Sequence, residues 1–307
     1  MSPPSVLAPA GAEAAALTEV AWVLIVGAIA IAALTLSLAA VALRRRRREV
    51  PIAWWTIGGG IVFPTVVLAP LLVYDIWRTP RADRDADEKA LVIGVTGRMW
   101  WWDIRYADPV SGRTVRVANE LRVPVGRPVR LALASSDVIH SFWVPELGGK
   151  VDMVPGRVLP LRFSAGRAGI YRGQCAEFCG EQHARMALHV VAVAPAEFER
   201  WLAGQASDAP EPSSALLQAG RQAFLEHGCS VCHDVRGVAV GSERGPDLSH
   251  VGSRLHLGAG VLANGPGAPA AWITGVQALK PGAHMPAANA IDAATLTTLS
   301  AYLSSLR

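Results

Sequence analysis

The chain has 307 residues, room for two or three domains, and 51% of them are hydrophobic, with a mean hydropathy of +0.29. This composition is too apolar for a chain that is soluble throughout, and it indicates membrane segments. The formal net charge of +4 becomes slightly negative when a single run of five arginines, Arg44 to Arg48, is set aside. The basic charge is therefore local, which argues against nucleic-acid binding.

Residues 21–43 and 52–74 form two charge-free segments of 23 residues each, and helices of that length can cross a bilayer. Buried core helices are the alternative, but they seldom stay free of charge over such a length. Arg44 to Arg48 lie between the segments and belong on the cytoplasmic side, so both termini are expected outside. We expect a transmembrane hairpin over residues 20–78, after a loose outer tail over residues 1–19.

Short apolar runs replace the long ones from Leu91 to Val193. Runs such as "LVIGVTG", "PVRLALAS", "TVRVANELRVPVG" and "MALHVVAV" are rich in Val and Leu, with Gly or Pro between them. Regularly spaced short strands are typical of an antiparallel sandwich or barrel. We therefore predict a β domain over residues 90–203, which closes with a short helix at "AEFERWLAG".

A polar linker follows over residues 204–214, where "QASDAPEPSS" is rich in Pro and Ser. Beyond it, "ALLQAGRQAFLEHG" and "DAATLTTLSAYLSSL" have helical patterns and flank Gly-rich loops. The last third of the chain, residues 215–307, is therefore predicted to be a small all-α domain.

The stretch "QCAEFCGEQHARM" gathers four side chains that bind soft metals: Cys175, Cys179, His183 and Met186. A disulfide between the cysteines is permitted in an oxidising outer compartment, but it leaves the histidine and the methionine unexplained. Zinc accepts cysteine and histidine and has little use for methionine. Thiolate, imidazole and thioether together select copper.

The number of thiolates decides how many copper ions this site holds. A mononuclear blue-copper centre takes one cysteine and two histidines, so a second thiolate is left over here. Two thiolates can instead bridge two copper ions, and each ion then requires one imidazole. His140, in "SSDVIHSFWVPELGGK", follows a β-like run and is the candidate for the second imidazole, whereas His189 in "ALHVVAV" is interpreted as a strand side chain.

A second metal motif, "CSVCH", comprises Cys229, Cys232 and His233, with the spacing of a c-type haem attachment site. The two thioethers fix the porphyrin edge, and the histidine ligates the iron. A redox dithiol or half a zinc site is disfavoured, because no further cysteine pair follows. Met285, in "KPGAHMPA", is the candidate for the second axial ligand, which would raise the reduction potential, and the adjacent His284 is its main rival.

The C-terminal segment, from Leu216 to Leu306, resembles class I cytochrome c. Its "GPDLSHVGSR" resembles the loop after the haem motif, in which the carbonyl of Pro246 would hold the proximal histidine. Its "KPGAHMP" resembles the methionine loop of that family.

Residues 20–200 resemble subunit II of the haem–copper cytochrome c oxidases, whose binuclear copper centre is called CuA. The family pattern is "D-V-x-H-S" followed by "C-x-E-x-C-G-x-x-H-x-x-M", and both parts are present, at residues 137–141 and 175–186. The resemblance implies a cupredoxin-like antiparallel β-barrel. It also implies the ligands of the two copper ions. Cys175 and Cys179 would supply bridging thiolates, His140 and His183 one imidazole per copper, Met186 a weak thioether and Glu177 its backbone carbonyl.

The same resemblance suggests three further roles. The carboxylate of Glu177 would bind magnesium at the interface with subunit I. Trp100, in "RMWWWDIRY", matches the tryptophan that passes electrons to copper, although packing of a β domain explains these tryptophans equally well. The family's glutamate near a proton entrance corresponds to Ile52, and Glu49, one turn earlier, more simply neutralises the arginine loop, so proton uptake stays unassigned.

As a whole, the chain resembles subunit II of a caa-type oxidase in a bacterial inner membrane, with both metal domains periplasmic. The resemblance implies that electrons from cytochrome c, or from another periplasmic donor, pass through the covalent haem c to CuA. They would then reach subunit I, where oxygen is reduced to water with proton translocation, so the chain itself holds no oxygen-reducing site. The expected partners are subunits I and III, the donor and membrane lipid, with no nucleic acid.

Two other functions stay open at this point. The chain could be the CuA subunit of a nitric oxide reductase, or a membrane-tethered electron carrier without an obligate catalytic partner. A quinol-oxidase subunit II has the same architecture but lacks the copper ligands, and it is disfavoured.

Overall fold

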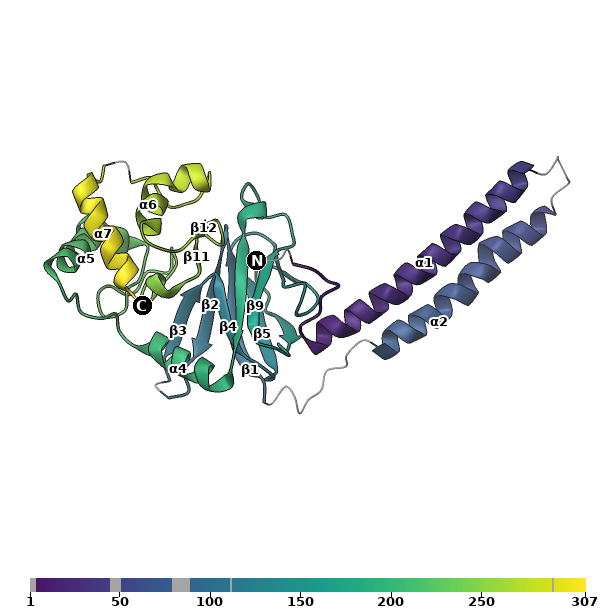
Figure 1. Cartoon of the computed structure of the whole chain (residues 1–307), viewed down its shortest axis with the longest axis horizontal. Coiled ribbons are helices and arrows are strands. Elements are labelled where there is room, and N and C mark those ends of the chain that lie inside the picture. The colour runs from purple at the N-terminus through teal and green to yellow at the C-terminus, as the bar shows by residue number, and fades with distance from the viewer. Residues whose placement is uncertain (1–3, 45–50, 79–88, 111, 289) are drawn as a thin grey trace.

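The computed structural model describes residues 4–44, 51–78, 89–110, 112–288 and 290–307. Figure 1 shows three parts in a row: a pair of long helices, a central β domain and a small helical domain on the far side of it. This arrangement agrees with the predicted order of parts, in which two apolar N-terminal helices precede a β domain and a small helical domain.

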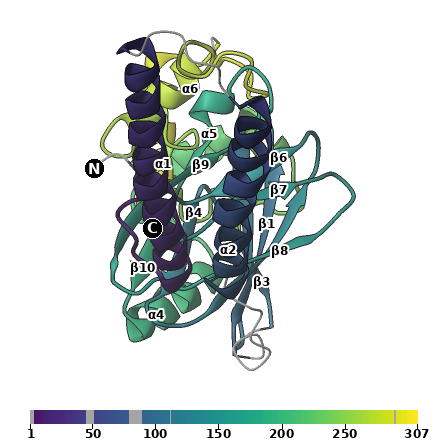
Figure 2. The same cartoon turned by 90° about the vertical axis from the view of Figure 1, so that its right-hand side faces the viewer.

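The N-terminal helices run side by side (Figure 2) and are long and apolar enough to cross a membrane. The first, α1, spans Ala12–Arg44, and the second begins as the π-helix η1 (Trp54–Val62) and continues as α2 (Phe63–Arg78). Proline has no N–H, so Pro64 near this junction disfavours a regular α-helical hydrogen bond there. Residues 45–50, which include most of the arginine run and Glu49, lie outside the described residues.

The chain before the membrane helices is attached to the β domain, so the expectation of a loose tail was wrong for this segment. The amide of Ala10 donates to the carbonyl of Glu146 at 2.7 Å, and its own carbonyl accepts from Gly166 at 2.7 Å. The carboxylate of Glu13, in the first turn of α1, accepts from the amide of Ser164 at 3.0 Å. Backbone groups make most of this attachment, and a sequence pattern does not reveal them.

The β domain is built from two five-stranded sheets, ordered β3-β2-β1-β5-β8 and β4-β10-β9-β6-β7. The strands are β1 (Leu91–Arg98), β2 (Trp101–Ala107), β3 (Thr114–Ala118), β4 (Glu120–Pro124), β5 (Val129–Ser135), β6 (His140–Trp143), β7 (Val151–Met153), β8 (Leu159–Phe163), β9 (Gly169–Cys175) and β10 (Ala187–Val193). The buried faces of both sheets supply one apolar core.

The strand pairing differs from the expected pattern in two places. The pairs β1–β5 and β4–β10 are parallel, and the other strand pairs are antiparallel. Between β1 and β5 the chain builds β2 and β3 in the same sheet and β4 in the other sheet, and it then returns to the end of the sheet at which β1 begins, so β5 runs parallel to β1. The barrel-like domain was therefore predicted correctly, while its purely antiparallel pairing was not.

Asn119 explains why one predicted apolar run, "TVRVANELRVPVG", serves both sheets. Its φ of 63° lies in the left-handed region, which asparagine tolerates better than most residues. Its side-chain oxygen accepts from the amide of Trp102 at 2.9 Å. The reversal divides the run into β3, which pairs with β2, and β4, which pairs with β10 in the other sheet.

The helix α4 (Pro195–Ala206) closes the β domain, and the C-terminal domain follows. That domain contains α5 (Ala215–Glu226), the turns η3 (Cys229–Val231) and η4 (Val251–Ser253), the short strands β11 (His256–Leu257) and β12 (Leu262–Ala263), α6 (Ala268–Leu279) and α7 (Ala293–Ser305). The helices α5 and α7 cross closely at Gly220, where a β-carbon would lie 2.2 Å from the carbonyl of Thr298.

Candidate metal centres

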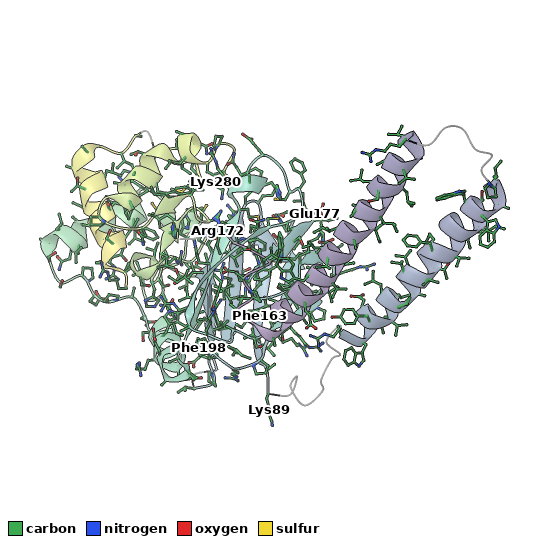
Figure 3. The ribbon with its side chains drawn as sticks, turned by 45° about the vertical axis from the view of Figure 1, so that its right-hand side comes forward. Lys89, Phe163, Arg172, Glu177, Phe198 and Lys280 are labelled. Atoms are coloured by element: carbon green, nitrogen blue, oxygen red, sulfur yellow. The ribbon has the colours of Figure 1, made fainter. Side chains whose placement is uncertain are left out.

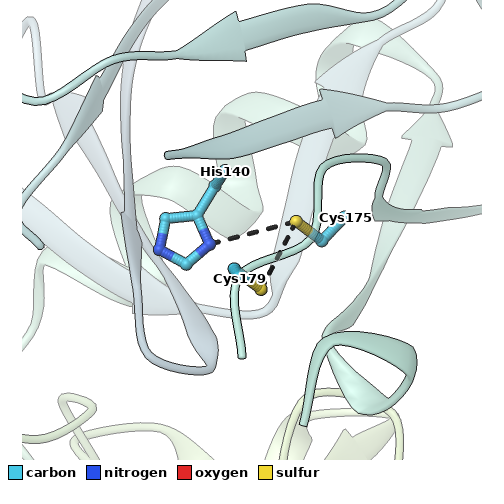
Figure 4. A group of neighbouring side chains, drawn as sticks. All are labelled: His140, Cys175 and Cys179. Atoms are coloured by element: carbon cyan, nitrogen blue, oxygen red, sulfur yellow. Dashed lines mark hydrogen bonds between the residues drawn. The ribbon is translucent and has the colours of Figure 1, made fainter. Parts of the chain in front are cut away.

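The six predicted copper ligands lie together at one end of the β domain. The two thiols, Cys175 Sγ and Cys179 Sγ, are 3.8 Å apart, and Figure 4 shows them beside the imidazole of His140. Cys175 Sγ is 3.9 Å from His140 Nδ1, and Cys179 Sγ is 3.7 Å from His183 Nδ1. The thioether of Met186 lies 3.9 Å from Cys179 Sγ, and the carbonyl of Glu177 lies 3.2 Å from Cys175 Sγ.

The chemistry of this cluster fits copper. A disulfide requires about 2.05 Å between its sulfur atoms, so the 3.8 Å separation shows two distinct thiols. Two thiols, two imidazole nitrogens and a thioether form a soft donor set that suits copper better than a hard cation. His140, Cys175 and Cys179 are buried, which would shield an ion from water.

Local folding explains how the motif gathers its ligands. The strands β9 and β10 pair with each other, and the amide of Cys175 donates to the carbonyl of Met186 at 2.9 Å. This pairing closes the connection over residues 176–186 between the two strands, whose turn η2 (His183–Arg185) presents the second imidazole. Gly180 has a φ of 110°, a conformation that side chains rarely adopt, and it lets the chain reverse after Cys179.

His140 comes from a different hairpin, and Asp137 orients it. Its Nε2 is 2.7 Å from Asp137 Oδ1, and the other carboxylate oxygen accepts from the amide of Met99 at 2.9 Å. A histidine with one nitrogen on a carboxylate presents its other nitrogen to a metal, here Nδ1 toward Cys175. Sequence reasoning gave Asp137 no role, although the motif "D-V-x-H-S" contains it.

The hydrogen bonds within this cluster shift the pKa values of its groups. Burial acts to lower the pKa of His140, but the hydrogen bond with Asp137 and the neighbouring Cys175 raise it to about 9. The hydrogen bond from Cys179 lowers the pKa of Cys175 to about 3, and the same interaction raises the pKa of Cys179. Metal binding requires the thiolate form of each cysteine and the neutral form of the histidine, so binding would release the protons that this cluster shares.

The three consecutive tryptophans have separate places. Trp102 is fully buried and packs edge-to-face on Phe142 in the core, and Trp101 lies under the guanidinium of Arg98. Trp100 is 8% exposed, and its ring N–H donates to the carbonyl of Cys179 at 2.8 Å. Trp100 is therefore the tryptophan that is hydrogen-bonded to the backbone of Cys179, while the buried ring of Trp102 lies 6.4 Å from that of His140.

The haem motif lies at the start of the C-terminal domain, with Cys229 and Cys232 partly exposed on and after the turn η3. His233 Nδ1 is 2.8 Å from the carbonyl of Pro246, as the resemblance to cytochrome c implied. A carbonyl can only accept, so this contact puts the proton on Nδ1 and leaves Nε2 as the ligand atom. Gly245 allows the close approach, because a β-carbon there would lie 2.8 Å from the imidazole.

The two rivals for the second axial position differ in their surroundings. Met285 is partly buried and packs against the apolar core of the C-terminal domain, as does Cys229. His284 is exposed, and its ring centroid lies 6.4 Å from that of Trp100, in the β domain. These surroundings favour Met285 for a site inside the domain.

The backbone carbonyl and the side chain of Glu177 point in different directions. Its carbonyl approaches Cys175, while its side chain is 44% exposed and its carboxylate lies 3.8 Å from Lys150 Nζ. Within the described ranges, its carboxylate belongs to no cluster of His, Cys, Asp or Glu side chains that could hold a metal ion.

The C-terminal domain packs directly on the β domain, through contacts that sequence reasoning missed. His189 lies in β10, as predicted, and its ring stacks on that of His256 at 4.4 Å. Arg116 of β3 forms a 2.9 Å ion pair with Asp234, the residue after the haem histidine. Lys280 reaches across to the backbone of Trp100 at 2.7 Å. The methionine loop therefore covers the tryptophan that touches the cysteine cluster.

Comparisons with known proteins identify two families along the chain. The family described as cytochrome C oxidase subunit II, periplasmic domain, matches residues 108–193, and cytochrome c matches residues 217–307. Cytochrome c oxidase subunit 2 of Alkalihalophilus pseudofirmus is 38% identical over 251 residues, which are 80% of this chain and 71% of that protein. The protein of the same name from Bacillus subtilis is 30% identical over 244 residues, 75% of this chain and 67% of that protein.

Among solved structures, the periplasmic domain of subunit II of cytochrome oxidase of Bradyrhizobium japonicum is similar. It has 31% sequence identity and a TM-score of 0.35, with 41% of this chain and 95% of that chain covered.

Proposed function

Because the chain belongs to the family of cytochrome c oxidase subunit 2, we propose that it is the electron-transfer subunit of a respiratory haem–copper oxidase. It is a component of an oxidoreductase complex, and its two domains imply copper and haem c as cofactors. Its obligate partner is subunit I, which reduces oxygen to water with proton translocation. Subunit III and a periplasmic cytochrome c, or another donor, complete the proposed set of partners.

We assign a binuclear copper centre to the cysteine cluster. Cys175 and Cys179 lie between the two imidazoles, so each thiolate can be shared while each ion takes one histidine. Met186 and the carbonyl of Glu177 complete the donor set. Copper bound there, like haem bound at Cys229, Cys232, His233 and Met285, would supply reversible one-electron transfer. The protein's part is to hold the ligands rigid and dry, which keeps the reorganisation small.

The observation that carries the proposed route is the position of Trp100. Its ring N–H contacts the carbonyl of Cys179, and its ring lies beside His284, the neighbour of the proposed haem ligand. It is almost completely buried beneath the C-terminal domain, so a soluble donor cannot dock on it directly. We therefore propose that electrons enter at the haem domain and reach the cysteine cluster through Trp100.

The membrane arrangement follows from the arginine run. We propose that α1 and the helix of η1 and α2 span a bacterial inner membrane, with Arg44 to Arg48 cytoplasmic and both metal domains periplasmic. The proposed domains are residues 20–78, 90–203 and 215–307, joined by the linker over residues 204–214. The outward carboxylate of Glu177 is the proposed magnesium ligand at the interface with subunit I.

A matched pair of tryptophan variants tests the route in the assembled oxidase. Trp100→Phe should slow electron transfer from haem c to copper, because it removes the indole N–H that contacts Cys179. Trp101→Phe is the control, because that ring packs on Arg98 and not on the cluster. Equal rates in both variants, with metal contents unchanged, would refute the route.

The subunits that co-purify with the wild-type chain, and the gas that the complex consumes, distinguish between the candidate functions. Co-purification with a large multi-haem subunit that consumes oxygen supports the proposal. Consumption of nitric oxide alone would point to a nitric oxide reductase, and a stable isolated chain with both metals would point to a tethered carrier.

A further inference from the structure

Lys280 is a buried cation at the boundary between the two soluble domains. It follows the last residue of α6, is 3% exposed and is labelled in Figure 3, where the helical domain meets the β domain. Its ammonium donates to three backbone carbonyls, those of Trp100 at 2.7 Å, Arg185 at 2.9 Å and Gly258 at 3.0 Å. An ammonium has three N–H groups, so each one has an acceptor.

Burial without a carboxylate partner makes the charged form of Lys280 energetically unfavourable. In the part of the chain that the structure describes, Lys280 forms no ion pair with a carboxylate. Burial lowers its pKa to about 7, and the nearby Cys179 only partly offsets that effect. The three hydrogen bonds to carbonyls must therefore offset the desolvation cost of this ammonium, and an apolar side chain would leave those acceptors unpaired.

The three acceptors belong to segments that matter for the proposed electron route. Trp100 contacts Cys179 through its ring, and Arg185 directly precedes the copper ligand Met186. The third acceptor, Gly258, belongs to the C-terminal domain itself. One side chain thus joins the tryptophan, the copper-binding loop and the haem domain at a single point.

A second side chain ties this point to the proposed haem ligand. Gln277, one turn before Lys280 in α6, donates to the carbonyls of Ala283 and Met285, both at 2.8 Å. Its amide oxygen accepts from the backbone of Gly282 at 3.1 Å. The loop from Lys280 to Met285 is therefore held by hydrogen bonds from Gln277 within its own domain, and Lys280, its first residue, is hydrogen-bonded to the β domain.

We propose that Lys280 is a positioning residue, which fixes the methionine loop of the haem domain on Trp100 and thereby sets the rate of electron transfer between the two metal centres. This inference rests on the proposed function, since it presupposes transfer from haem to copper. It adds a specific cause for the rate: three hydrogen bonds from one buried ammonium hold the donor and acceptor domains in register.

The test replaces Lys280 in the complete oxidase and measures the haem-to-copper transfer rate after rapid electron injection. Lys280→Met fills the same space without donors and should slow transfer by about tenfold or more, because small misplacements of reacting groups have effects of this size. Lys280→Gln keeps two N–H donors and should give an intermediate rate. Glu243→Gln is the matched control, because it removes one exposed ion pair, with Arg105 at 2.9 Å, from the same boundary.

A second measurement separates positioning from damage to the metal sites. The haem and copper spectra should stay those of the wild type in Lys280→Met, and backbone amides of residues 277–285 should exchange hydrogen faster. If the methionine variant loses its spectra, the glutamine variant decides alone: a slower rate supports the proposal, and an unchanged rate overturns it.

The possible failures are distinguishable. A wild-type rate in Lys280→Met with intact spectra overturns the positioning role and leaves the proposed function standing. Absence of haem-to-copper transfer in the wild-type oxidase would overturn the proposed function itself.

Discussion

Replacing Asp137 with asparagine should weaken copper binding without changing any atom that binds the metal. Asp137 Oδ1 lies 2.7 Å from Nε2 of His140, whose ring is completely buried. An asparagine has nearly the same shape, but it removes the charge that holds the imidazole. Loss of such a partner typically lowers metal affinity by about 10- to 100-fold.

In the copper-free protein, the raised pKa of His140 gives an independent measure of how strongly its neighbours stabilise the charged imidazole. Asp137 and Cys175 raise the pKa of His140 from 6.5 to about 9, which corresponds to about 3 kcal/mol at 1.36 kcal/mol per unit. Because folding raises this pKa, the stabilisation is fully present below pH 6.5 and is lost as the pH rises through 9. Asp137→Asn should remove most of this pH dependence.

The assay is a copper titration against a competing chelator, followed by denaturant unfolding of the copper-free protein at several pH values. Asp152→Asn is the matched control, because that exposed carboxylate pairs with Lys150 outside the cluster. Copper affinity in Asp137→Asn equal to that of the control would refute the orienting role of Asp137.

Two further predictions concern the copper thioether and the boundary between the domains. Met186→Leu should shift the copper potential and slow transfer while the fold survives, and an unchanged potential in a redox titration would show that Met186 is not a ligand. Burial lowers the pKa of His189 from 6.5 to about 4. The docked state therefore binds fewer protons than the separated domains. Docking of the two domains should be complete above about pH 6.5 and should weaken as the pH falls toward 4. His256 and Arg172, which face His189, add to the repulsion once it is protonated. Because burial also lowers the pKa of His256, His189→Gln should reduce the dependence in hydrogen-exchange measurements, and His189→Gln combined with His256→Gln should abolish it.

The copper cluster could be predicted because most of its ligands are close in sequence. One connection between paired strands supplies Cys175, Cys179, His183 and Met186, so their spacing reveals the site. His140 comes from another hairpin, and only the need for a second imidazole pointed to it. The haem motif was visible for the same reason, since its two cysteines and histidine occupy five consecutive positions.

The contacts of Lys280 between the domains could not be predicted, because its partners are backbone carbonyls. Every residue carries a carbonyl, so nothing in the sequence marks those of Trp100 and Arg185 as acceptors for Lys280. The attachment of Ala10 to the β domain was hidden in the same way, whereas Asp137 was overlooked although it lies in the same motif as His140. Parallel strand pairing also depends on how the chain returns to a sheet, which local patterns do not record.

The copper and haem content of the purified full-length protein tests the central claim most directly. Metal analysis, combined with visible and near-infrared spectroscopy, should find two coppers and one covalently bound haem per chain. One copper per chain, or zinc in place of copper, would contradict a binuclear centre built from the two thiols 3.8 Å apart.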